Sequence, residues 1–191
     1  MKRYLRIVPL TVAVSCMAFA QETTIPIPLL NPGFEQDELA CAPGYYCFYP
    51  GVSGWLAGPQ TQIFKPSTVQ FPGGVPGGVN VAAVGNNGST SSILQVTPAV
   101  VQANTIYTLR LSVGARTDFA FTGYTAALMA GNMTLAFDDT LTPAAGTFLT
   151  DIIVYKAGAN PIQLGQALQI LVKSIGTGQV DIDNVSLTAT Q

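Results

Sequence analysis

The sequence predicts an all-β protein built as a two-sheet antiparallel jelly-roll sandwich. Charged residues make up only 9% of the 191 residues, whereas there are 19 glycines and 13 prolines. Apolar residues, many of them β-branched, stand in short runs between turn-forming clusters, which favours strands over helices. No linker, charge block or repeat divides the chain, so we expect a single domain over residues 21–191.

The first 20 residues predict a secretory signal peptide. An apolar run over residues 7–19 follows three basic residues and ends in an Ala-x-Ala cleavage pattern at residues 18–20. The run is shorter than the roughly 20 apolar residues of a membrane-spanning helix, so no transmembrane anchor is expected. Lipidation at Cys16 is an alternative, but Ala13 stands where a larger aliphatic residue is expected. We therefore expect a secreted or extracellular protein, which includes attachment at the cell surface.

Alternating apolar and polar residues mark the strands. The clearest predicted strand runs from Ile106 to Arg116, where one face carries Tyr107, Leu109, Leu111 and Val113. Segments 148–154 and 168–173 alternate in the same way. Clusters of Gly, Pro and Asn separate such segments at residues 72–78, 85–88, 131–132, 143–146 and 176–178. This spacing is typical of roughly eight to ten strands in a jelly roll.

The last predicted strand breaks its own alternation. Its apolar residues at positions 180 and 182 share one parity, and those at 185 and 187 share the other. A β-bulge at Asp183-Asn184 would bring both halves onto one face, and bulges often re-aim side chains beside functional sites. Asp183 is therefore a candidate site residue. The alternative is a twist at a sheet edge, with Asp183 accepting backbone hydrogen bonds.

Charge and residue inventory argue against two classes of function. Eight basic residues face ten acidic ones, and three of the basic residues lie in the signal peptide. No basic patch remains for nucleic acid. The chain has no histidine, which excludes Ser-His-Asp and Cys-His catalysis. The carboxylate pair Asp138-Asp139 is typical of a turn, and the pair Asp181 and Asp183 suits a cation better than acid–base work, so we expect no enzyme.

Cys41 and Cys47 are the only cysteines after the signal peptide. In an exported chain an even pair predicts a disulfide. The bond would close a short loop and contribute about 2 kcal/mol. A staple on a surface loop is the favoured interpretation over a redox role, because no C-x-x-C spacing or neighbouring cation lowers a thiol pKa.

Three motifs occur in an order that resembles a known family. They are Leu30–Glu35, Pro50–Trp55 and Val180–Leu187, and the middle of the chain adds Ser92–Val96 and Asn104–Gly114. Together they resemble the galactose-binding-like jelly roll of carbohydrate-binding modules and bacterial cell-surface proteins. The resemblance covers nearly all of the chain after the signal peptide. It implies a non-catalytic module that binds carbohydrate or a cell-surface glycan.

Candidate ligand-binding residues follow from the needs of a sugar site, which combines aromatic rings with polar groups. Tyr45, Tyr46 and Tyr49 lie in an aromatic loop beside the expected disulfide. Such rings are costly to expose unless they meet a partner or cover one end of the fold. Arg116 and Tyr124 are candidates for a polar floor, although a solvated strand face is the simpler explanation for them.

The resemblance also implies a structural calcium ion between the first and last strands. The matching acidic positions are Glu35, which closes the opening motif, and Asp183 in the expected bulge. Ca²⁺ accepts carboxylate and carbonyl oxygens in loose geometry. The alternative is that both are ordinary surface acids or that one caps a backbone turn.

A second class of function is a structural or adhesive surface protein that assembles with protein partners or as a homo-oligomer. Segment 75–84, flanked by double glycines, is a candidate exposed sheet edge for such contacts. The single tryptophan, Trp55, follows a Pro-Gly turn, and we expect it in the core rather than as a platform for sugar.

Overall fold

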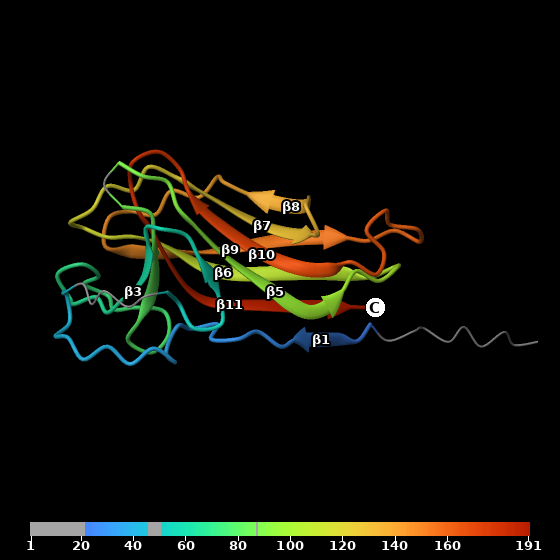
Figure 1. Cartoon of the computed structure of the whole chain (residues 1–191), viewed down its shortest axis with the longest axis horizontal. Helices are drawn as coiled ribbons and strands as arrows, with labels where there is room; N and C mark the ends of the chain where they lie inside the picture. The colour runs from blue at the N-terminus through green and yellow to red at the C-terminus, as the bar shows by residue number, and fades with distance from the viewer. Residues whose placement is uncertain (1–21, 46–50, 87) are drawn as a thin grey trace, which may run out of the picture.

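The computed structural model describes residues 22–45, 51–86 and 88–191. It shows two antiparallel sheets packed face to face, which confirms the predicted two-sheet sandwich (Figure 1). Within these residues there is no helix, and hence none long and apolar enough to cross a membrane. The predicted signal peptide lies outside the described residues.

The first sheet has the order β3-β4-β11-β6-β9, and β1 pairs with the other end of β11. Its strands are β1 (Thr24–Ile27), β3 (Thr61–Phe64), β4 (Val81–Val84), β6 (Ile106–Ala115), β9 (Thr147–Lys156) and β11 (Val180–Thr190). The second sheet has the order β2-β5-β10-β7-β8. Its strands are β2 (Leu56–Ala57), β5 (Ser92–Val100), β7 (Tyr124–Ala130), β8 (Met133–Asp138) and β10 (Ala167–Ser174).

The main core lies between the sheets and follows the predicted alternation. On β6 the inward side chains of Leu109, Leu111 and Val113 are fully buried, as a period of two requires for a strand with one face on the core. Ile170 on β10 meets them from the second sheet as part of the same core cluster. The strands predicted around residues 106–116, 148–154 and 168–173 are confirmed as β6, β9 and β10. On β9 the core side is not the face that the alternation marked as apolar, because Ile152 and Val154 are about half exposed whereas Asp151 and Ile153 are buried.

The predicted bulge in β11 is also confirmed. The pairing of β11 with β6 shifts register between Asp183 and Ser186, and Asn184 has a φ of 54°. Left-handed backbone is a conformation that Asn tolerates better than most residues. The extra residue keeps both Ile182 and Val185 in the core, and it leaves Asp183 on the outer face of the first sheet.

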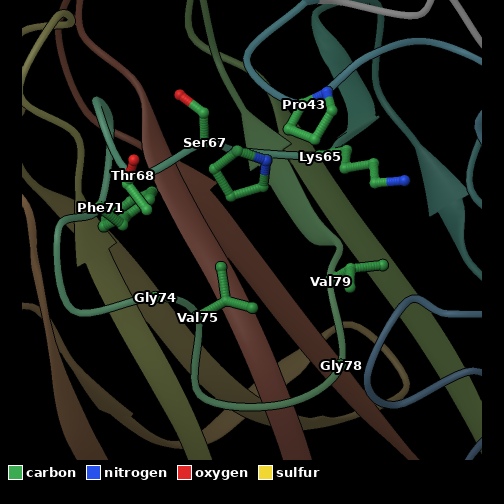
Figure 2. A pocket seen from close by; sticks show the side chains of 10 residues that line it. Pro43, Lys65, Ser67, Thr68, Phe71, Gly74, Val75, Gly78 and Val79 are labelled. Carbon is green, nitrogen blue, oxygen red and sulfur yellow. The ribbon is translucent and has the colours of Figure 1, made fainter.

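The expectation that segment 75–84 forms an exposed sheet edge is wrong. Strand β4 lies between β3 and β11, and all four of its residues are buried. The residues before it form a loop, residues 72–80, that folds over the outer face of the first sheet. Figure 2 shows this loop, with Gly74 and Val75, passing over the ribbon of β11.

Trp55 belongs to the core, as predicted. The residue is 8% exposed, and its ring centre lies 5.6 Å from that of Phe34. Its indole nitrogen donates a hydrogen bond to the carbonyl of Asn31 at 3.2 Å.

We predict that Trp55→Ala lowers the free energy of unfolding by about 3–5 kcal/mol. Leu56→Ala is the control, because that neighbouring side chain is 69% exposed. Thermal melts that find equal losses for both variants would contradict the core assignment.

Candidate active site on the outer face of the first sheet

A second apolar cluster lies on the outer face of the first sheet, separate from the main core. It consists of Phe64, Val81 and Ala83, with Val75 and Phe148 packed against them, and we call it the outer cluster. Val81 and Ala83 alternate with Ala82 and Val84, which belong to the main core. Strand β4 is therefore apolar on both faces, a pattern typical of strands covered on both sides. Here the outer cover includes Val75 of the loop.

Asp181 lies beside this cluster. It pairs with Ala83 of β4 on one side and with Gly114 of β6 on the other, so its side chain shares their outer face. The side chain is fully buried, and Oδ1 accepts a hydrogen bond from Nε2 of Gln179 at 2.8 Å. Oδ2 has no hydrogen-bond partner in the described part of the chain.

The surroundings of Asp181 favour its neutral form. Loss of solvent raises the pKa of this carboxyl to about 7, against the opposing effects of the Arg116 charge and the Gln179 hydrogen bond. A carboxyl group with such a pKa carries a proton in a large fraction of molecules at neutral pH. It can therefore donate a proton, as a general acid does.

Aromatic rings form one wall beside Asp181. A side chain at Gly114 would overlap the ring of Phe148, so glycine at this position lets the ring lie close against the sheet. Phe71 stacks on Phe148 with ring centres 4.4 Å apart and an angle of 30° between the planes. The stacked pair gives the site a flat apolar surface.

Arg116 stands at the edge of the same site and is almost fully buried. It forms a two-pronged ion pair with Asp118, in which both nitrogen–oxygen distances are 2.8 Å. Its guanidinium carbon lies 4.1 Å from the ring centre of Phe64 and 5.4 Å from that of Phe119. The hydrogen bonds from Arg116 lower the pKa of Asp118. Arg116 is thus part of a buried polar edge, not of a solvated strand face.

Two cavities flank the loop over the outer cluster. One has a volume of about 200 Å³ and is lined by residues that include Lys65, Phe71, Val75 and Val79 (Figure 2). The other, of about 440 Å³, lies between loop residues 72–76 and residues 145–148. Both cavities share Gly74 and Val75, so this part of the loop separates two spaces next to the aromatic wall.

The other predicted ligand residues do not gather at this site. Tyr124 lies between the sheets, where its hydroxyl donates a hydrogen bond to Oδ2 of Asp151 at 2.7 Å. Burial and this bond raise its pKa. The structure therefore does not combine Arg116 and Tyr124 in one polar floor. Tyr45 is exposed, whereas Tyr46 and Tyr49 lie outside the described residues.

One cysteine of the predicted disulfide also lies outside the described residues. Cys41 is disulfide-bonded, but its predicted partner Cys47 lies outside the described residues. The pairing of these two cysteines therefore stays a prediction.

The two predicted calcium ligands hold one end of the loop. Oε1 of Glu35 accepts hydrogen bonds from the backbone nitrogens of Val79 and Asn80, at 2.9 and 2.8 Å. Oδ2 of Asp183 accepts one from Gly77 at 2.8 Å. Burial, followed by the effect of the Glu35 charge, raises the pKa of Asp183 to about 6. A cation between the carboxylates would relieve this repulsion.

Side chains alone would not complete such a metal site. Among the described residues no group of three or more Asp, Glu, Cys or His side chains could hold a metal ion. Calcium at Glu35 and Asp183 would need backbone carbonyls and water as further ligands, which Ca²⁺ accepts. The donor set fits calcium on these terms, and the site stays a prediction.

Together, the fold and the site define a jelly-roll protein with a buried carboxyl group under an apolar cover on one sheet. The family model of the HpiC1 cyclase matches residues 25–188. The chain therefore belongs to the HpiC1-like cyclase family. No curated protein matches this sequence.

Solved structures agree with this assignment. The Stig cyclase Fisc from Fischerella sp. TAU, in complex with (3Z)-3-(1-methyl-2-pyrrolidinylidene)-3H-indole, is 28% identical with a TM-score of 0.79, over 87% of this chain and 98% of that one. A cyclase from Fischerella sp. TAU in complex with 4-(1H-indol-3-yl)butan-2-one is also 28% identical, with a TM-score of 0.77, over 86% and 97% of the two chains.

The similarity to carbohydrate-binding modules concerns the fold alone. The module TmCBM61, in complex with beta-1,4-galactotriose, is 16% identical with a TM-score of 0.54, over 84% of this chain and 97% of that one. The predicted resemblance is confirmed at this level. The predicted carbohydrate or glycan partner is wrong, because the family is a cyclase family and two of the similar cyclase structures hold indole compounds.

The prediction that the chain is not an enzyme is wrong for the same reason. The search for acid–base chemistry looked for histidine or for two cooperating carboxylates, and it grouped Asp181 with Asp183 as cation ligands. Alternation along the strand placed both on one face. It could not show that Asp181 is fully buried in the folded chain, and this burial is the largest cause of its raised pKa.

The calcium prediction can be tested by thermal unfolding. A metal that binds only the folded state at 100 times its dissociation constant stabilises it by about 2.7 kcal/mol. For a domain of this size that raises Tm by roughly 5–10 °C. We predict this rise for the protein without its signal peptide in millimolar calcium relative to EDTA. Glu35→Gln and Asp183→Asn should abolish it. An equal wild-type Tm in calcium and in EDTA would refute the predicted calcium site.

Proposed function

We propose that this protein is a cyclase that closes a ring in an indole-type small molecule, with Asp181 as the proton donor. The observation that carries this proposal is a fully buried carboxyl group whose Oδ2 lacks a hydrogen bond within the described residues, beside an apolar cluster. The indole compounds held by two similar cyclase structures support the substrate class.

Proton transfer from Asp181 would start the reaction. The proton leaves Oδ2 for a basic atom of the substrate, such as the imine nitrogen of a 3H-indole or a carbonyl oxygen. This makes the neighbouring carbon electrophilic. The π electrons of an alkene in the same molecule attack that carbon, so the alkene π bond breaks as the new carbon–carbon bond closes the ring and leaves a carbocation. A proton lost from the cyclised cation returns to the carboxylate, so substrate and product are isomers and the acid is regenerated.

The residues around Asp181 stabilise the charges that this transfer creates. The positive charge of Arg116 and the hydrogen bond from Gln179 both favour the Asp181 carboxylate. Asp118 pairs with Arg116 and moderates its effect, so Asp181 keeps enough proton affinity to act as an acid. On the substrate side, the partly buried ring of Phe148, which the buried Phe71 supports by stacking, can stack on an indole and stabilise a cation.

The loop contributes by excluding water from the reacting atoms. Val75 packs on the outer cluster, and the carboxylates of Glu35 and Asp183 hold the end of the loop at residues 77–80. A closed apolar site prevents water from trapping a reactive intermediate. Calcium bound at these two carboxylates would supply further fastening of the loop, without taking part in the chemistry.

We also propose that the protein works outside the cytoplasm. The amino-terminal sequence supports this location, with its basic start, its apolar run over residues 7–19 and its Ala-x-Ala pattern. Extracellular modules bind calcium with dissociation constants of about 10⁻⁴ to 10⁻³ M. A site with few carboxylates, such as Glu35 and Asp183, suits that range.

The proposal predicts that Asp181 is required for cyclisation. The protein without its signal peptide is incubated with 3-substituted indoles that carry an alkene together with an imine or ketone, and products of unchanged mass are separated by liquid chromatography and identified by mass spectrometry. Asp181→Asn should lower the rate about 10²- to 10⁴-fold, as expected for loss of a general acid. It should still bind 4-(1H-indol-3-yl)butan-2-one.

The matched control is Asp151→Asn. Asp151 is also buried, at 2% exposure, but it faces the space between the sheets and bonds Tyr124. This variant should keep the wild-type rate once differences in stability are allowed for. The proposed function would be refuted if Asp181→Asn cyclised the substrate at the wild-type rate. It would also be refuted if the wild-type protein gave no new isomer from any of the indoles.

A further inference from the structure

Gln179 contacts Asp181 directly and stands just before β11. The two side chains are almost fully buried, and the amide Nε2 donates to Oδ1 at 2.8 Å. An amide NH₂ group can donate but not accept. Oδ1 is therefore an acceptor in this contact, and a proton carried by the carboxyl group resides on Oδ2.

The backbone around Gln179 is held firmly in place. Its nitrogen donates to the carbonyl of Ala120 at 2.9 Å, and the nitrogen of Gly178 donates to Oγ1 of Thr122 at 2.8 Å. A side chain at Gly178 would overlap the Ala120 carbonyl, so only glycine permits this close approach. The segment before β7 thus fixes the position from which the Gln179 amide reaches Asp181.

We propose that Gln179 is a positioning residue, which holds the Asp181 carboxyl so that Oδ2 is the oxygen presented to the substrate. The inference rests on the proposed function of Asp181 and adds a role that the acid alone does not require. A carboxyl group can turn about its Cβ–Cγ bond, and a terminal torsion of this kind is broad. The hydrogen bond from Gln179 to one oxygen fixes this torsion, and with it the direction in which the other oxygen points.

The test is the variant Gln179→Met, which keeps an unbranched side chain of similar length and removes the donor. Misplacing a catalytic group by about 1 Å can cost roughly 100-fold in rate. We therefore expect kcat to fall by about 100-fold, with KM unchanged for the indole that the wild-type protein cyclises. Affinity for 4-(1H-indol-3-yl)butan-2-one should be unchanged as well.

Gln163→Met is the matched control, because Gln163 is also a buried glutamine, 5% exposed, whose amide contacts Met133 instead. It reports the cost in stability of replacing a buried amide without touching Asp181. Gln179→Leu is the second variant if the methionine variant is too unstable to purify. Crystal structures of the wild type and of the Gln179 variant should show the Asp181 carboxyl turned in the variant.

The outcomes separate this inference from the function on which it rests. Suppose that Asp181→Asn is inactive while Gln179→Met has the same kcat as Gln163→Met. This result would overturn the positioning role and leave the proposed function intact. Cyclisation by Asp181→Asn would overturn the proposed function, and the crystal structures would then decide the positioning role. An Asp181 carboxyl in the same orientation with and without Gln179 would overturn that role.

Discussion

The burial of one carboxyl group, Asp181, is the constraint on which the rest of the site depends. An isolated ionised carboxylate is costly to remove from water, and such a group takes up a proton unless it is paired. Here Gln179 bonds only one of its oxygens, and Arg116 shares its charge with Asp118. The pKa of Asp181 therefore lies above that of an exposed aspartic acid and below that of a buried carboxyl group with no partner. Such a pKa suits proton donation near neutral pH.

The fold supplies this environment through features that lie far apart in the sequence. Asp181 and Asp183 share the outer face by simple alternation, and the bulge after Asp183 keeps Val185 and Leu187 in the core. Asp183 and Glu35 then hold the end of the loop whose Val75 packs on the outer cluster. The proposed acid, its cover and the anchors of that cover are thus joined through one strand.

Much of the fold could be predicted from the sequence, because alternation records which side chains face the core. It identified β6 and β10 with their inward faces, and the break in alternation located the bulge at Asp183 and Asn184. It located β9 as a strand but gave the wrong inward face, because Ile152 and Val154 are exposed and Ile153 is buried. The closeness of Glu35 and Asp183 to one another was implied by the resemblance to galactose-binding-like jelly rolls, and both carboxylates do hold the same loop. The role of Asp181 could not be predicted, since alternation gives the face of a strand but not what covers that face. The absence of histidine was misleading as well, because burial can give a carboxyl group the pKa for which histidine is usually chosen.

A crystal structure of the protein with 4-(1H-indol-3-yl)butan-2-one would test the central claim most directly. The account predicts that the indole ring lies between loop residues 72–78 and the outer cluster, with the ketone oxygen within hydrogen-bonding distance of Oδ2 of Asp181. The cavity at the other end of the sandwich, about 290 Å³ in volume and lined by Ile25, Ile27 and Tyr107 among others, offers an alternative place for an apolar ligand. An indole bound there, with no ligand near Asp181, would contradict the account.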